Sequence, residues 1–320
     1  MTTVLVTGVG AVTGYGILRT LRKRRPELRL VGIDTNADAV GAHWCSRFVT
    51  CPPTIEPSYL QWLHSIICHE HVDLVLPTLD ADLDLFRATG AAAYLTAALA
   101  LNSDTALAMS RDKLELDRQL AAHDDPARIP TSTSTDFDEL RASLGAPFLL
   151  KARRGYGSRG IVTIADPIEF EHHAPHLPDD LIAQQMVGRD DDEYTVGAFG
   201  DGHDRFCARI VMRRTLFPWG TTRRVEVVDA SPDLDATIDR LAPIIAPQGP
   251  TNLQFRRSET GAWMLLEVNA RVSSSASLRD LFGYREAEMA IDYYLEGEVP
   301  AQPEIRTGSA VRYLEDLITT

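Results

Sequence analysis

Short apolar segments alternate with helical patterns through the first third of the chain. Residues 3–8, 28–34 and 72–76 are apolar runs of strand length, and the stretches between them include segments with the apolar spacing of a helix. Parallel strands need long crossover connections, which helices usually supply. This alternation therefore predicts an α/β domain with a parallel sheet at the amino-terminal end.

The pattern changes after the segment DDPARIPTSTSTD, residues 124–136. Strand-like segments then follow in quick order, with Gly and Asp turns between them. Strands joined by short turns favour antiparallel pairing. We therefore expect an α+β region with strands over residues 148–153, 160–164, 181–187, 193–200, 206–214 and 222–228.

Composition and charge narrow the class of protein. A chain of 320 residues can form two or three domains, and 44% hydrophobic with 24% charged residues is typical of a soluble globular protein. The formal charge of −13 argues against nucleic-acid binding, which needs a basic face. No apolar run approaches the ~20 residues that span a bilayer, and the start lacks a signal-peptide pattern, so we expect a cytoplasmic protein. Cys45, Cys51, Cys68 and Cys207 show no paired spacing and are expected to be reduced thiols.

Lysine is rare in this chain. Only three of the 32 basic residues are lysines, namely Lys23, Lys113 and Lys151. Because arginine serves wherever any cation suffices, a retained lysine is a candidate for a place that needs a compact, strongly hydrated point charge. Lys23 lies in the run RKRRPE and is expected on a helix surface, which leaves Lys113 and Lys151 as candidates for chemistry.

A glycine-rich loop follows Lys151. In PFLLKARRGYGSRGIVTI, residues 147–164, one apolar strand enters a loop with Gly155, Gly157 and Gly160, and a second apolar strand follows. Backbone N–H groups in such a loop can turn toward a common point and bind an anion, and the lysine adds a positive charge. Two interpretations stay open here: a phosphate-binding loop, or a hairpin loop whose glycines only supply positive φ angles.

The segment TNLQFRRSETGAWMLLEVNAR, residues 251–271, predicts a β-hairpin. Thr260 and Gly261 fit a two-residue turn between alternating strands, and that register places Gln254 across from Glu267. Successive side chains of a strand alternate faces. The polar face is then formed by Asn252, Gln254, Glu267, Asn269 and Arg271, with Asn252 across from Asn269, and the apolar face by Leu253, Phe255, Leu266 and Val268.

The polar face of this hairpin offers ligands for a divalent cation. Mg²⁺ prefers oxygen ligands, and Gln254, Glu267 and Asn269 would supply amide and carboxylate oxygens together. Glu, Asn and Arg at alternate positions beside a core are unfavourable unless an ion or a phosphate satisfies them. The alternative is an amphipathic hairpin with one hydrated face.

Five segments in this order resemble the ATP-grasp superfamily, most of all its carbamoyl-phosphate-synthase-type and carboxylate–amine ligase branches. They are SRDKLELDRQL, IPTS, PFLLKARRGYGSRGI, LIAQQMVGRDDDEYTV and the pair NLQF with LLEVNAR. The stretch from VLVTGVGAVTGYG to LVGIDTNADAVGAHWCSRFVTCPP is similar to the Rossmann-like domain that precedes the ATP-grasp fold in that family. The resemblance implies such a domain over residues 1–105, a small ATP-grasp subdomain with the phosphate loop over 106–187, and a carboxy-terminal subdomain with the Mg/ATP site over 188–320.

The resemblance also implies how ATP is held. Lys113 and Lys151 match lysines that contact phosphate, and Lys151 is counted among the catalytic residues. The loop over Gly155, Gly157, Ser158, Arg159 and Gly160 would close over the β- and γ-phosphates. Gln185, Met186 and Val187 match the hinge that contacts adenine, and Glu193 matches an acidic position near the ribose.

The same resemblance implies the chemistry. Gln254, Glu267 and Asn269 match Mg²⁺ ligands, and Arg271 matches an arginine that steadies the transferred phosphoryl group. The implied reaction is attack of a carboxylate on ATP to give an acyl phosphate and ADP, followed by attack of an amine or ammonia. Four arginines flank TLFPWGTT, and we expect Arg213 and Arg223 to bind the substrate carboxylate through a planar fork, although each pair could instead be solvated strand-edge charge.

Two other classes of function stay open. Gly8, Gly10 and Gly14 with Asp34 suggest a nicotinamide-dependent oxidoreductase, but their spacing is one residue longer than the usual dinucleotide fingerprint. None of the three lysines has a tyrosine four residues before it, which excludes a short-chain dehydrogenase. The other class is a nucleotide-binding regulatory protein without turnover. We expect ATP and Mg²⁺ as cofactors, small-molecule acid and amine substrates, and neither nucleic acid nor membrane as partner; a homodimer stays open.

Overall fold

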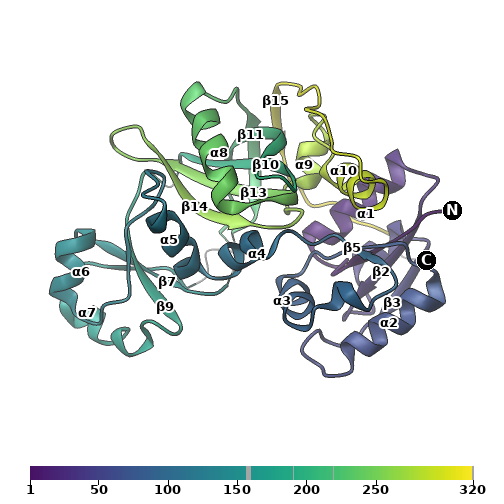
Figure 1. Cartoon of the computed structure of the whole chain (residues 1–320), viewed down its shortest axis with the longest axis horizontal. Coiled ribbons are helices and arrows are strands. Elements are labelled where there is room, and N and C mark those ends of the chain that lie inside the picture. Colours follow the sequence, from purple (N-terminus) through teal and green to yellow (C-terminus); the bar gives the residue numbers. More distant parts are fainter. Residues whose placement is uncertain (156–159, 190, 219, 319–320) are drawn as a thin grey trace.

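The computed structural model describes residues 1–155, 160–189, 191–218 and 220–318. Figure 1 shows three sheets side by side, with a four-stranded sheet at the left, a six-stranded sheet in the centre and a five-stranded sheet at the right. Along the chain, the right-hand sheet comes first, the left-hand sheet second and the central sheet last. The mixture of one parallel and two antiparallel sheets confirms the predicted combination of α/β and α+β parts.

The amino-terminal sheet is parallel throughout, as predicted. Its elements are β1 (Thr3–Thr7), α1 (Val12–Arg24), β2 (Arg29–Asp34), η1 (Val40–Trp44), β3 (Arg47–Thr50), α2 (Tyr59–Glu70), β4 (Leu74–Leu76), α3 (Asp80–Thr89), η2 (Ala91–Ala93) and β5 (Ala98–Leu99). The strand order is β3-β2-β1-β4-β5. The three apolar runs became β1, β2 and β4, whose side chains are buried between helices. β3 and β5 are additional short strands at the two edges.

The four-stranded sheet is antiparallel and small. Its elements are β6 (Thr131–Ser132), α6 (Phe137–Leu144), β7 (Phe148–Ala152), β8 (Val162–Ile164), α7 (Pro167–Glu171), η3 (Ala174–His176) and β9 (Leu181–Gln185). The order is β6-β9-β7-β8. Its core combines aliphatic side chains with three aromatic rings, since the ring of Phe148 lies 5.8 Å from that of Phe137 and 6.0 Å from that of Phe170 between centroids. This compact core supports the strand that carries Lys151.

The six-stranded sheet is antiparallel and has helices on both faces. Its elements and those around it are α4 (Asp104–Arg111), α5 (Lys113–Ala122), β10 (Glu193–Asp201), β11 (Phe206–Leu216), β12 (Thr222–Val227), α8 (Pro232–Ile245), β13 (Gln248–Arg257), β14 (Trp263–Asn269), α9 (Ala276–Asp280), α10 (Glu286–Ile291), η4 (Asp292–Glu296) and β15 (Gly308–Val311). The order is β14-β13-β10-β11-β12-β15. One face packs against α8, and part of the other packs against α9 and α10.

Helices α4 and α5 belong by packing to the large sheet. Buried Leu107, Met109, Leu116 and Leu120 lie in the same apolar core as the β13–β14 hairpin and α8. Ser103 caps α4 by accepting a hydrogen bond from the Ala106 N–H at 3.1 Å. Residues 106–127 therefore pack with the six-stranded sheet and not with the four-stranded one. The predicted domain boundaries at residues 105 and 187 stay a prediction.

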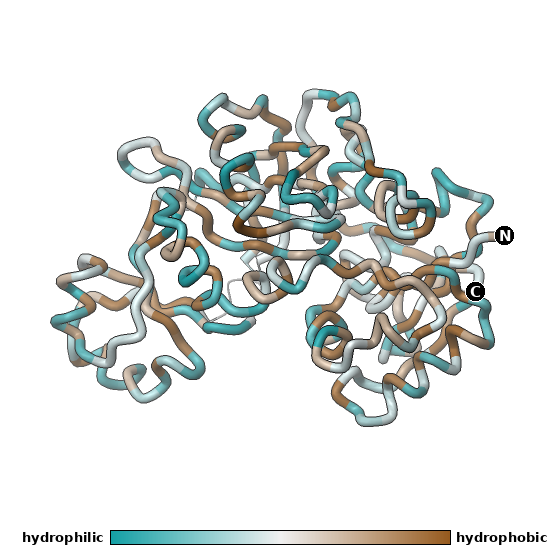
Figure 2. Tube along the Cα trace, in the orientation of Figure 1, coloured by the Kyte–Doolittle hydropathy of each residue, from teal (hydrophilic) through white to brown (hydrophobic). Residues whose placement is uncertain are grey.

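The amino-terminal domain and the large sheet share one core. Side chains of β1, β4 and α1 pack with those of β11, β12, α9 and α10 in a single apolar cluster. At its margin, Arg24 of α1 donates to the Asp280 carboxylate at 2.6 and 3.1 Å. In Figure 2, hydrophobic stretches run through the sheets, whereas hydrophilic residues gather in the outer loops. The amino-terminal domain is thus joined to the large sheet by a packed interface.

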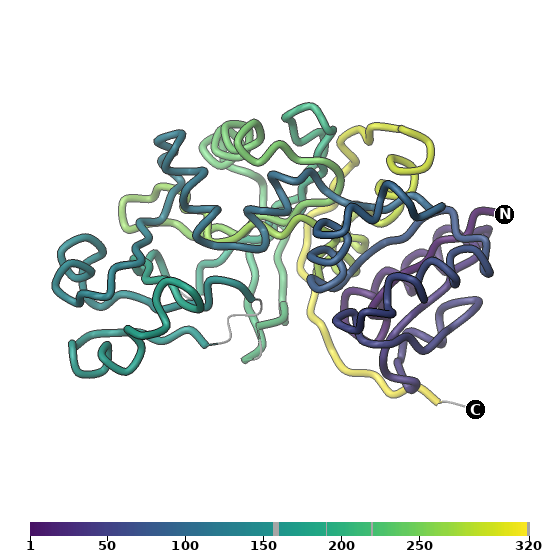
Figure 3. Tube along the Cα trace, turned by 60° about the horizontal axis from the view of Figure 1, so that its bottom comes forward, coloured from purple at the N-terminus to yellow at the C-terminus, as the bar shows by residue number. Residues whose placement is uncertain are grey.

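Residues 312–318 run along the outside of the molecule (Figure 3). After β15 the chain is irregular, and Figure 3 shows it extending past the amino-terminal sheet. Arg312 fastens its start by donating to the Thr222 carbonyl at 3.1 Å and the Ser274 carbonyl at 2.6 Å. Across the described ranges, none of the helices combines the length and the apolar character that a membrane crossing requires.

Candidate functional site

The β13–β14 hairpin has the predicted polar face. Gln254 pairs with Glu267, and Asn252 pairs with Asn269, as the sequence indicates. Neighbouring β10 extends this face, because Thr195 lies beside Gln254. The face therefore spans at least three strands.

The register is right although the predicted turn is wrong. Instead of a two-residue turn at Thr260 and Gly261, Ser258 closes a longer loop by donating to the Ala262 carbonyl at 2.8 Å, with Gly261 at φ 86°. A bulge at Gln254 and Phe255 then leaves Leu266 without a partner and restores the pairing of Gln254 with Glu267. One extra loop residue and one bulge residue cancel each other. Leu265, rather than Leu266, consequently lies in the apolar core.

Glu267 is the unpaired carboxylate of this face. Its half-buried side chain has neither a hydrogen-bond partner nor an ion-pair partner among the residues that the structure describes. Asn252 is different, since its Oδ1 accepts from Thr195 at 2.7 Å and from the buried Arg279 guanidinium. The arrangement leaves Glu267 as the anionic group that is free to bind a cation.

Lys151 projects from β7 of the small sheet toward the same region. Its Nζ donates to the Gln184 Oε1 at 2.6 Å, and Gln184 in turn donates to Thr131. Burial and the charge of Lys113 lower the pKa of Lys151 to about 8, while Glu267 opposes that shift. Lys151 is therefore within electrostatic reach of both Lys113 and Glu267, although the three residues come from separate segments.

The base of the glycine loop is tied to α5. Asp112, the residue that caps α5, forms ion pairs with Arg153 at 2.7 Å and with Arg154 at 3.1 Å. The Lys113 N–H donates to the Arg153 carbonyl at 3.1 Å, and its Nζ donates to the Gly155 carbonyl at 3.3 Å. These contacts explain why two arginines follow Lys151: they anchor the loop beside Lys113.

Only the ends of the predicted phosphate loop can be described. Gly155 has φ 140° and Gly160 has φ 71°, conformations that favour glycine. Gly157, Ser158 and Arg159 lie outside the described residues.

The predicted hinge leaves the small sheet at the end of β9. The Gln185 N–H donates to the Pro130 carbonyl at 3.0 Å, and Met186 is exposed. Gly188 follows with φ 62°, and a Cβ there would lie only 2.4 Å from the Arg257 carbonyl oxygen. The segment that includes Val187 thus passes directly over the end of β13, between the two sheets.

Glu193 is held between two arginines. Its Oε1 accepts from Arg214 at 2.5 and 2.9 Å, and its Oε2 accepts from Arg256 at 3.0 Å. Burial opposes ionisation, but the two arginines hold the pKa of Glu193 below its usual range. Both carboxylate oxygens are thus engaged by arginines, and the position of Glu193 near a ribose stays a prediction.

Arg213 lies on the opposite face of the sheet from Glu267. Arg213 lies directly across from Tyr194, and Tyr194 lies across from Phe255, so Arg213 shares the apolar face of the sheet. It is exposed and pairs with Glu226 at 3.0 Å. The neighbouring residue Arg214, not Arg213, lies on the sheet face that carries Glu267.

Arg223 occupies a less regular position. It is the extra residue of a bulge between β11 and β12, where Thr215 pairs with Arg224 and Leu216 with Thr222. Its side chain is exposed and has no hydrogen-bond or ion-pair partner in the described ranges. Arg223 therefore remains a candidate for binding a substrate carboxylate.

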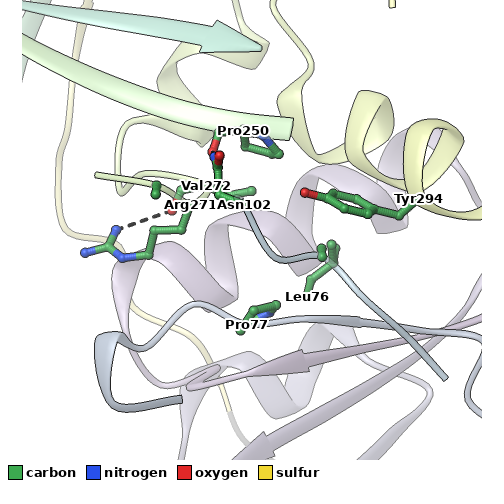
Figure 4. Close-up of a pocket in the computed structure, with 9 residues that line it drawn as sticks. Leu76, Pro77, Asn102, Pro250, Arg271, Val272 and Tyr294 are labelled. Atoms are coloured by element: carbon green, nitrogen blue, oxygen red, sulfur yellow. Dashed lines mark hydrogen bonds between the residues drawn. The ribbon is translucent and has the colours of Figure 1, made fainter. Parts of the chain in front are cut away.

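Arg271 lies just beyond the end of β14. Its Nε donates to the Asp80 Oδ1 at 2.7 Å, and its Nη1 approaches the Val272 carbonyl at 3.4 Å. Figure 4 shows the guanidinium pointing away from Leu76, Pro77 and Tyr294. Those residues line a cavity of about 10 Å³ between the amino-terminal domain and the large sheet. That volume holds about one water, so this cavity is a small gap in the domain interface and is too small to bind a substrate.

The amino-terminal glycine segment is filled by the protein itself. The Gly10 N–H donates to the Asp34 Oδ2 at 2.7 Å, so the acid expected at a ribose binds the loop instead. A Cβ on Gly8 would lie 2.6 Å from the Leu79 side chain, so Leu79 occupies the space beside this glycine. This arrangement argues against a dinucleotide lying on that segment.

Comparisons with known proteins agree with this geometry. Residues 179–317 match the family model described as "ATP-grasp in the biosynthetic pathway with Ter operon". The fold superimposes on N5-carboxyaminoimidazole synthetase from Staphylococcus aureus with a TM-score of 0.74, at 14% identity over 95% of this chain and 80% of the other. The chain has an ATP-grasp fold.

Two further ATP-grasp-fold structures extend the comparison. Biotin carboxylase from Campylobacter jejuni matches with a TM-score of 0.75, at 15% identity over 96% of this chain and 74% of the other. L-amino acid ligase from Bacillus licheniformis matches with a TM-score of 0.70, at 15% identity over 96% and 78%. The Staphylococcus protein was determined with ADP. These neighbours are ligases and carboxylases of the ATP-grasp fold, and at this identity they establish the fold alone.

A curated relative matches part of the chain. The uncharacterized protein y4rH of Sinorhizobium fredii is 26% identical over 174 residues, which is 47% of this chain. The match spans about a third, 33%, of the length of that relative.

Several residues of the candidate site were not predicted from the sequence. Arg256 could have been found, because it lies two positions from Gln254 and so on the same strand face. Arg214 was one of four flanking arginines, but no local signal distinguished its face from that of Arg213. Gln184 and Asp80 gave no signal, since their partners lie 33 and 191 residues away along the chain.

Proposed function

We propose that this protein is an ATP-dependent, ADP-forming carboxylate–amine ligase, with an amine or ammonia as acceptor and an amino acid or small metabolite as the acid. The observation that carries the proposal is that Lys151 interacts electrostatically with both Lys113 and Glu267, which come from separate segments of the chain, while Lys113 also donates to the base of the glycine loop at Gly155. Two ammonium groups opposite an unpaired carboxylate are suited to a polyphosphate with its cation.

The residues present fit a magnesium nucleotide. No cluster of three or more His, Cys, Asp or Glu side chains suited to a metal occurs within the described ranges. A cation here would depend on Glu267, with the amides of Gln254 and Asn269, and on phosphate oxygens and water, which is how Mg²⁺ is commonly held. Bound Mg²⁺ would neutralise charge on the phosphates. The hinge over Gln185, Met186 and Val187 would receive the adenine.

The residues of the chain would divide the chemistry as follows. Lys113 and Lys151 hold the phosphates, and the loop between Gly155 and Gly160 covers them and excludes water from a fragile acyl phosphate. Arg271 stabilises the charge on the transferred phosphoryl group. A carboxylate oxygen of the substrate bonds to the γ-phosphorus while the bond to ADP breaks. The amine then bonds to the acyl carbon, inorganic phosphate leaves and the nitrogen loses a proton. Glu193 acts indirectly by holding Arg214 and Arg256.

The experiment is an ADP-release screen with MgATP over a panel of acids and amines. The proposed ligase should release ADP above background only when one acid and one amine are present together. Nucleotide binding without any acid- and amine-dependent release would instead indicate the regulatory alternative. Tight NAD(H) binding with no thermal shift from MgATP would indicate the oxidoreductase alternative.

A further inference from the structure

An acid of the amino-terminal domain contacts Arg271, one of the predicted site residues. Asp80 is the first residue of α3, directly after the loop that follows β4. Its Oδ1 lies 2.7 Å from the Arg271 Nε, and its Oδ2 lies 3.1 Å from the Arg111 Nη1. The three side chains are 8, 15 and 16% exposed, so these ion pairs are largely shielded from water. Shielded pairs are costly to break, because the remaining charge stays without a partner.

The two arginines depend on Asp80 to different degrees. Arg111 has a second carboxylate, since it donates to both oxygens of Asp84 at 2.8 Å. Within the described part of the chain, Asp80 is the one carboxylate that Arg271 contacts directly, and the buried Glu286 acts on it only electrostatically. Loss of the Asp80 charge would therefore leave Arg271 without a directly bound carboxylate, whereas Arg111 would keep Asp84.

The contact also decides which donors Arg271 presents. Asp80 takes the Nε, the Val272 carbonyl lies near Nη1, and Nη2 has no acceptor within the residues described. The backbone N–H of Arg271 is itself fixed on the Asn269 carbonyl at 2.9 Å. A guanidinium held at its base, with its outer edge free, is oriented to donate to an anionic group.

Asp80 also interacts electrostatically with other charged residues of the candidate site. Burial opposes ionisation of Asp80, but Arg271, Arg111 and Lys113 together hold its pKa below the usual range. Glu267 acts in turn on Arg111. Asp80 is thus within electrostatic reach of Lys113, and its partner Arg111 is within reach of Glu267.

We propose that Asp80 is a positioning residue that orients Arg271 toward the γ-phosphate, so that the amino-terminal domain is a working part of the phosphate site. This inference rests on the proposed function, because it assumes that Arg271 faces a triphosphate. It assigns the amino-terminal domain a role that its glycine segment does not provide.

The test compares two nucleotides that differ in the γ-phosphate. Affinities for MgADP and for the β,γ-imido analogue of MgATP are measured by calorimetry on the full chain. Asp80→Asn should weaken binding of the ATP analogue about tenfold and leave MgADP within about twofold. Asp84→Asn, the same change on the same helix at a half-exposed position, should leave both affinities within about twofold.

A double-mutant cycle separates positioning from a general structural effect. Arg271→Ala should lose the same preference for the analogue, and Asp80→Asn combined with Arg271→Ala should lose no more than Arg271→Ala alone. Asp80→Glu, which keeps the charge, should recover most of the preference, and it serves as the informative variant where Asp80→Asn does not fold.

The outcomes distinguish the two proposals. Equal losses for MgADP and the analogue in Asp80→Asn, no loss at all, or additive losses in the double variant would overturn the role of Asp80 while wild-type nucleotide binding stands. Failure of the wild-type protein to bind either nucleotide would overturn the proposed function itself, and this inference with it.

Discussion

Arg213 and Arg214 are consecutive in β11 and lie on opposite faces of the six-stranded sheet. Arg213 is half exposed and pairs with Glu226, which is also half exposed. Arg214 is 8% exposed and donates to Glu193, whose other oxygen binds Arg256. The two side chains therefore differ in environment although the sequence presents them as equivalent.

We expect Arg214→Ala to destabilise the protein much more than Arg213→Ala. Removal of one partner from a buried ion pair typically costs about 3 kcal/mol of unfolding free energy, because the other charge remains buried. Loss of an exposed pair changes it by less than about 0.5 kcal/mol. Urea unfolding of the two variants measures the difference. Similar unfolding free energies for both would contradict the placement of Arg214 as a buried ion-pair partner of Glu193.

The sequence predicted those features that depend on local patterns. Alternating apolar runs identified the strands of the parallel sheet, because burial between two helical layers requires nearly continuous apolar strands. The polar face of the hairpin was found because side chains alternate along a strand. Even so, the pairing of Gln254 with Glu267 was right only because a longer loop and a bulge compensate each other.

Features that depend on distant partners could not be predicted. The face on which Arg213 lies depends on the register between β10 and β11. No tight turn next to Arg213 fixes that register, so the sequence does not reveal the face. The contact of Arg271 with Asp80 joins two domains across 191 residues. Arg214 and Arg256 occupy both carboxylate oxygens of Glu193. A match to a family motif at position 193 does not reveal these partners, because they lie elsewhere in the chain.

Lys151 should take up a proton when nucleotide binds at pH 8. Burial and Lys113 lower its pKa to about 8, so about half of the free protein carries the neutral amine at that pH. A bound phosphate favours the ammonium form and raises the pKa again. Calorimetry of MgATP binding in buffers of different ionisation enthalpy should show uptake of up to about 0.5 proton, which declines toward pH 6.5.

Two variants check the source of that proton. Lys151→Met should abolish the uptake and weaken MgATP binding. Lys23→Met, the same change in the last turn of α1, should leave both unchanged. Equal proton uptake by wild type and Lys151→Met would show that another group titrates on binding.

Glu267→Gln should raise the Mg²⁺ requirement of the protein. The change preserves the shape of the side chain but removes the one unpaired carboxylate of the hairpin face. We expect the Mg²⁺ concentration for half-maximal nucleotide binding to rise about tenfold or more. Glu259→Gln, in the exposed turn of the same hairpin, should stay within about twofold. An unchanged Mg²⁺ requirement in Glu267→Gln would exclude this carboxylate as a ligand.

Asp82→Asn should stabilise the protein at neutral pH. Asp82 is fully buried, its Oδ1 accepts from Thr54 at 2.8 Å and Tyr59 at 3.2 Å, and its Oδ2 has no hydrogen-bond partner in the described part of the chain. Burial raises its pKa in the folded protein. A raised pKa means that the folded state binds the proton more tightly than the unfolded state does. The resulting stabilisation is complete below the ordinary Asp value of 3.8 and is lost as pH rises through the folded value.

An asparagine keeps the acceptor and carries no charge at any pH, so its advantage should appear only where Asp82 would be ionised. We expect Asp82→Asn to raise the Tm by about 2 °C or more at pH 7.5 and to lose that advantage toward pH 4. Asp38→Asn, at an exposed position of the same domain, should show neither effect. A lower Tm for Asp82→Asn at pH 7.5 would contradict this prediction. It would mean that the charged carboxylate binds the Thr54 and Tyr59 hydroxyl groups more favourably than the neutral amide does, and that the folded protein requires this buried charge.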